Sequence, residues 1–121
     1  MASSSGFDLA ESYAIHQGAG FSFAIVYPGD VTSWTFKGEV RKAESMTSEL
    51  LGSFAFGTAT FDGEKTTIPV SLPHAQTLAM KPTAGSSRYY YDVIGFPIAG
   101  EPVWITGGQV QVKPGVTEIN V

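Results

Sequence analysis

The stretch RYYYDVIGFPIAGEPVWITGGQVQVK, residues 88–113, decides the fold. Two runs rich in Val, Ile, Tyr and Trp, Arg88–Phe96 and Glu101–Lys113, flank the segment Pro97–Gly100. Aromatic and β-branched residues favour strands, whereas Pro and Gly favour the turn between them. The stretch therefore predicts an antiparallel hairpin that closes a β domain.

Three consecutive tyrosines give this hairpin two different faces. Because side chains alternate along a strand, Tyr89 and Tyr91 are predicted in the core and Tyr90 on the outer face. Trp104 is predicted opposite Tyr90 across the hairpin, and exposed aromatic residues are frequent contact anchors. The candidate interface comprises these two outer residues, the hairpin tip and the end of the chain: Tyr90, Phe96, Pro97, Trp104, Val116, Thr117 and Ile119.

The whole chain shows the same pattern of short apolar runs, which 14 glycines and 7 prolines punctuate. In the third run, alternation directs Trp34, Phe36 and Val40 inward, with charged residues between them. About seven strands are predicted in all. Their ranges are Tyr13–Gln17, Phe21–Tyr27, Trp34–Ala43, Leu50–Phe61, Lys65–Leu72, Arg88–Phe96 and Glu101–Lys113.

Three positions depart from simple alternation. Pro73 suits a first helical turn and Pro82 ends one, so one or two helical turns are predicted between them, before the sixth strand. Pro69 lacks a backbone donor, which predicts an edge position for its strand. Gly107-Gly108 predicts a β-bulge.

Seven strands with one short helix before the sixth match an all-β, immunoglobulin-like antiparallel β-sandwich. The predicted domain covers residues 13–115. Residues 1–12 are small, polar and non-periodic, which predicts a flexible N-terminal arm, and residues 116–121 are predicted to leave the domain as an extended tail. Either segment is a candidate for strand addition to a neighbouring subunit.

The amino-acid composition limits the kinds of partner and chemistry that are expected for this chain. Seven basic and eleven acidic residues give a net charge of −4 without a basic stripe, which disfavours nucleic acid. The absence of cysteine excludes disulfides and thiolate catalysis. The first residues do not read as a secretory signal, and no apolar run approaches the ~20 residues that a membrane helix needs.

No catalytic signature is apparent. His16 and His74 have no further metal ligands nearby in sequence, and neither a G-x-S-x-G elbow nor a phosphate-binding loop occurs. Asp62 and Glu64 are explained by a hairpin turn. Asp92 is unusual because it lies inside a strand, where a cap or a solvent-facing position would account for it. We expect no enzyme activity, cofactor or metal.

Three segments resemble a known family. They are the glycine-containing lead-in and strand IHQGAGFSFAIVYPGDVTSWTFKGEVRK, the helical LPHAQTLAM, and YYYDVIGFPIAGEPVWITGGQVQVKPGVTE. Their order, over about residues 13–118, resembles the N-terminal immunoglobulin-like domain of bacteriophage baseplate upper proteins and related tail or fibre-attachment proteins.

The resemblance implies a non-enzymatic component of a tailed-phage virion, assembled in the host bacterial cytoplasm. Its expected partners are other virion structural proteins in the tail, baseplate or fibres, or copies of itself in a homo-oligomer. Two alternatives stay open. One is a capsid decoration protein, and the other is a β-sandwich that binds carbohydrate or protein through Trp104 and Tyr90.

Overall fold

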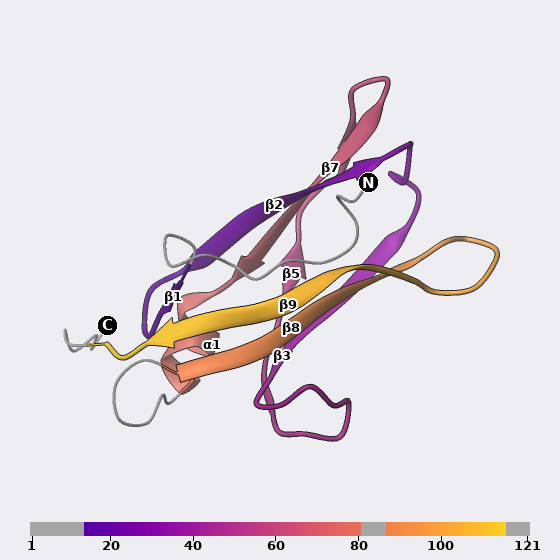
Figure 1. Cartoon of the computed structure of the whole chain (residues 1–121). Helices are drawn as coiled ribbons and strands as arrows, with labels where there is room; N and C mark the ends of the chain where they lie inside the picture. The colour runs from indigo at the N-terminus through magenta and orange to yellow at the C-terminus, as the bar shows by residue number, and fades with distance from the viewer. Residues whose placement is uncertain (1–13, 81–86, 116–121) are drawn as a thin grey trace.

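The structure, a computed structural model, describes residues 14–80 and 87–115. The predicted arm (1–12) and tail (116–121) lie outside the described residues, together with the candidate interface residues Val116, Thr117 and Ile119. Within the described part, two β-sheets face each other and one short helix lies at one end (Figure 1). The predicted all-β sandwich is therefore confirmed.

The described residues form nine strand segments and one helix. These are β1 Ile15–His16, β2 Phe21–Pro28, β3 Thr35–Arg41, β4 Leu50–Ser53, β5 Ala55–Phe56, β6 Thr60–Phe61, β7 Lys65–Leu72, α1 His74–Ala79, β8 Ser87–Phe96 and β9 Val103–Lys113.

The segments divide between a five-stranded and a four-stranded sheet. The five-stranded sheet has the order β1-β9-β8-β3-β4. The four-stranded sheet has the order β2-β7-β5, with β6 also paired to β7. All pairs are antiparallel except β1 with β9, which run parallel at the end of β9. The predicted closing hairpin is the β8–β9 pair at the centre of the five-stranded sheet.

The segment Leu50–Phe61, predicted as a single strand, is divided between the sheets. Its first part, β4, pairs with β3, whereas β5 and β6 pair with β7 on the other side of the core. Phe54, at the crossing point, is buried, and its amide donates to the Gly38 carbonyl at 2.9 Å. The change of sheet after β4 and the break between β5 and β6 divide the one predicted strand into three, so nine segments result rather than about seven.

Pro69 does not lie on an edge as predicted, because β7 is the central strand of the four-stranded sheet. The Pro69 carbonyl accepts from the Gly57 amide at 2.9 Å, so its nitrogen also faces the side of β5 and β6. There the ladder is interrupted between Phe56 and Thr60. A central proline is tolerated because the partner strand breaks where the donor is missing.

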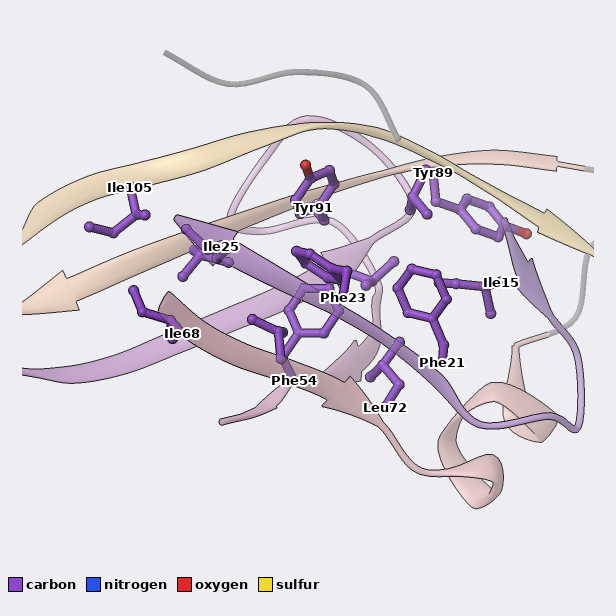
Figure 2. Packing of buried hydrophobic residues seen from close by; sticks show 14 of the residues in the cluster. Ile15, Phe21, Phe23, Ile25, Phe54, Ile68, Leu72, Tyr89, Tyr91 and Ile105 are labelled. Atoms are coloured by element: carbon purple, nitrogen blue, oxygen red, sulfur yellow. The ribbon is translucent and has the colours of Figure 1, made fainter. Parts of the chain in front are cut away.

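Aromatic rings meet at the centre of the core (Figure 2). Phe23 from β2 lies with its ring centroid 5.6 Å from Phe54 and 6.1 Å from Tyr91, both edge-on. Phe21 packs on the same ring at 5.7 Å. Tyr89 and Tyr91 are buried, as alternation predicts. Rings from both sheets therefore close the sandwich without a disulfide.

Helix α1 is the short helix predicted before the sixth strand. It holds the turn between β1 and β2 in place through side-chain hydrogen bonds. The buried Thr77 hydroxyl accepts from the Gly18 amide at 3.1 Å and donates to the Ala19 carbonyl at 2.8 Å. Gln17 donates to the Leu78 carbonyl at 3.1 Å and accepts from the Gly115 amide at 3.0 Å. These bonds join the helix, the first turn and the end of the described chain.

The bulge in β9 lies before the predicted glycine pair. Val93 pairs with Thr106 and Ile94 pairs with Trp104, so Ile105 is the extra residue. Ile105 and Thr106 are consequently both buried, although they are neighbours in sequence. The bulge also sets the face on which Trp104 lies, because it changes the alternation of the strand at that point.

Candidate interaction surface

The outer face of the five-stranded sheet holds the described candidate residues of β8 and β9. Side chains that are directly opposite one another on β3, β8 and β9 form three rows across this face. Each row lies beside the next along the strands. The rows are Arg41–Tyr90–Gln109, Glu39–Asp92–Gly107 and Lys37–Ile94–Trp104.

Trp104 and Tyr90 share this face but are not cross-strand partners. The register pairs Trp104 with Ile94 and Tyr90 with Gln109, and the row of Asp92 and Gly107 lies between. The predicted pairing was wrong because the hairpin register pairs Trp104 with Ile94, which lies four residues closer to the turn than Tyr90. The two rings therefore do not form one continuous aromatic surface.

The end of the β8–β9 hairpin carries exposed apolar side chains. Phe96, Ile98 and Trp104 are 37%, 85% and 43% exposed, and Pro97 is half-buried. Figure 1 shows this hairpin end reaching out from the two sheets. Sequence reasoning missed Ile98 and Ile94. The proline and glycine around Ile98 drew attention to the turn rather than to the side chain it exposes.

Trp104 rests against a glycine beside Asp92. A Cβ on Gly107 would lie 2.8 Å from the Tyr91 carbonyl oxygen, 2.9 Å from the Asp92 Cβ and 3.1 Å from the Trp104 Cζ2. The indole is thus in contact with bare backbone, and Gly107 is buried beneath it. We call Trp104, Gly107 and Asp92 the Trp–Asp platform.

The carboxylate of Asp92 faces a second carboxylate. Glu39 is its direct cross-strand neighbour, and Arg41 is committed to Glu39 through contacts of 2.8 and 3.2 Å and to the Ser48 carbonyl. No described residue donates a hydrogen bond to the Asp92 carboxylate. Loss of water around the Asp92 carboxyl and then repulsion from Glu39 raise its pKa, and Arg41 partly opposes them.

We expect Asp92→Asn to leave the free energy of unfolding at pH 7 unchanged or to increase it by about 0.2–1 kcal/mol, because it removes one of two facing carboxylates. Because the Asp92 pKa is raised in the folded state, ionised Asp92 lowers the free energy of unfolding. This loss of stability is complete above the raised pKa and disappears below the ordinary value of 3.8. The advantage of the variant should therefore shrink as the pH falls. Urea unfolding at several pH values measures it, and a clear loss of stability at pH 7 would show a stabilising role for Asp92.

The other titratable candidates serve local structure or stand apart. Asp62 accepts hydrogen bonds from the amides of Glu64 and Lys65, both at 2.9 Å, which lower its pKa and close the β6–β7 turn. His16 and His74 are exposed. Among residues 14–80 and 87–115, no three potential metal ligands come together. In the same residues, no helix has the length and apolar character to cross a membrane.

Neither a protein-family model nor a curated protein matches this chain. The candidate surface therefore has to be interpreted from its own side chains.

Proposed function

We propose that this chain is an immunoglobulin-like docking module of a tailed-phage virion, without catalytic activity. The strand order supports the immunoglobulin-like assignment. The order β9-β8-β3-β4 corresponds to the G-F-C-C′ strands of variable-type sandwiches, and β2-β7-β5 corresponds to B-E-D. The three segments that resemble phage baseplate and tail proteins span both sheets, α1 and the closing hairpin.

The observation that carries the docking role is the exposed apolar end of the β8–β9 hairpin. Phe96, Ile98 and Trp104 gather there on a projecting element, where Glu101 is the single charge of the connecting segment 97–102. Apolar and aromatic groups on such an element suit the desolvated centre of a protein interface. The proposed partners are other tail, baseplate or fibre subunits, including further copies of this chain.

A capsid decoration protein is the second candidate, since it would use a projecting apolar element in the same way. A carbohydrate-binding platform made of Trp104 and Tyr90 is less well supported, because Asp92 and Gly107 separate the two rings.

Immunogold electron microscopy of intact particles tests the proposal. Particles would be purified from the culture that carries this gene and labelled with antibody raised against the domain. Gold at the tail or baseplate is the expected result, and gold over the head would favour capsid decoration. Antibody preadsorbed with the protein is the control. If mass spectrometry of the purified particles lacked peptides of this chain, the virion role would be refuted.

A further inference from the structure

The row Glu39–Asp92–Gly107 contains residues that are unfavourable for the stability of a sheet. Aspartate and glycine are both depleted in strands, and like charges directly opposite each other are destabilising. A local structural need explains Gly107, because the Trp104 indole occupies the space of its missing side chain. Among residues 14–80 and 87–115, no comparable contact explains Asp92. A carboxylate kept at a cost to stability is a feature of binding sites.

The cations near Asp92 are already engaged. Arg41 binds Glu39 and the Ser48 carbonyl. Lys37 is largely exposed and lies 4.0 Å from Glu39, at the limit of an ion pair. Glu39 and Asp92 therefore place two carboxylates beside one guanidinium, that of Arg41 in the neighbouring row, which is bound to Glu39. Asp92 provides the unbalanced negative charge.

The aromatic part of the platform is held in place before any partner arrives. Trp104 is 43% exposed while its ring contacts the backbone at Gly107, and Ile94 is its cross-strand neighbour. An aromatic side chain that is already positioned loses little conformational entropy on binding. An exposed indole beside a free carboxylate offers both a π-face and an anionic acceptor.

We propose that the Trp–Asp platform binds the guanidinium of an arginine presented by a partner protein. A guanidinium is planar, stacks on aromatic rings and donates two parallel hydrogen bonds to one carboxylate. Ile94 and Phe96 on the same strand would contact apolar groups beside that arginine. This inference rests on the docking role proposed above and names the chemistry of the partner.

Two-dimensional ¹H–¹⁵N NMR of the full chain provides the test. The probes are N-acetyl-arginine methylamide, the lysine and glycine analogues, and methyl glucoside. We expect the arginine probe to shift the Trp104 indole N–H and the amides of Asp92, Ile94 and Gly107, and the glycine probe to leave them unchanged. Asp92→Asn should weaken arginine binding about tenfold, the effect of losing a hydrogen bond to a charged group.

Matched variants separate this site from general charge attraction. Glu64→Gln removes an acid from the β6–β7 turn and should leave arginine binding unchanged. Trp104→Leu keeps an apolar side chain on Gly107 and should weaken binding. The remaining amide signals of each variant report whether it is folded, and Asp92→Asn conserves side-chain shape.

Several results would overturn the proposal. Equal shifts with the lysine probe would leave only a general cation site, and shifts with the glucoside alone would indicate a sugar platform. Unchanged affinity in Asp92→Asn, or no shift with any probe, would remove the site. Concentration-dependent shifts of the same signals without probe would assign the face to a second copy of the chain. Virion labelling is independent of all these outcomes, so the two proposals can fail separately.

Discussion

Phe23→Ala is expected to lower the free energy of unfolding by about 3–5 kcal/mol, the range for removing a buried phenylalanine. The ring lies 5.6 to 6.1 Å from those of Phe21, Phe54 and Tyr91, which belong to three different parts of the chain. Its loss would leave a cavity at the point where the two sheets meet. The total free energy of unfolding of a typical domain is only about 5–15 kcal/mol, so this variant should be close to unfolding.

Urea unfolding followed by circular dichroism measures this effect. Phe61→Ala is the matched control, because Phe61 is 41% exposed on β6 and should cost less than about 1 kcal/mol. Similar losses for the two variants would show that the core is not centred on Phe23. A smaller slope of free energy against urea for Phe23→Ala would mean that the variant exposes less surface on unfolding.

Local patterns were sufficient for much of the fold. Alternation placed Tyr89 and Tyr91 inside and Tyr90 outside, because the two-residue period of a strand is a property of the chain itself. Pro73 likewise marked the start of α1, since proline is tolerated in a first helical turn. These features depend on neighbours in sequence.

Features set by distant pairing were not predictable in the same way. The change of sheet at Phe54 depends on which partner, β3 or β7, each half of Leu50–Phe61 meets. The central position of Pro69 depends on an interruption in another strand. The bulge at Ile105 was expected at Gly107-Gly108, because glycine suggests a bulge whereas here it provides space for an indole.

The candidate surface also combines features that depend on sequence neighbours with features that depend on distant pairing. Tyr90, Phe96 and Trp104 could be selected as outer-face residues from type and alternation alone. The relation of Trp104 to Asp92 could not, because it requires the register of β9 after the bulge. Asp92 was noticed as an acid inside a strand, but its facing carboxylate, Glu39, comes from β3, about fifty positions earlier.

Gly38→Ala is expected to lower the free energy of unfolding by about 1–3 kcal/mol, although it adds only a single methyl group. Gly38 lies on the inner face of β3, and a Cβ there would come within 2.7 Å of the Phe54 ring, 3.0 Å of the Asp92 carbonyl oxygen and 3.1 Å of Val93. The Phe54 ring is itself packed between Phe23 and Tyr91, and the carbonyl belongs to the adjacent strand. Neither neighbour can move without disturbing the crossing of the chain between the sheets.

Gly20→Ala is the matched control for this substitution. A Cβ on Gly20 would have the Leu72 carbonyl oxygen as its nearest neighbour at 4.0 Å, and Gly20 does not have positive φ. The variant should be neutral or more stable by about 0.4–1 kcal/mol, because alanine restricts the unfolded chain. Both free energies follow from urea unfolding under the same conditions. If Gly38→Ala were as stable as Gly20→Ala, the close contact between β3 and Phe54 would be disproved, and with it the point at which the chain passes from one sheet to the other.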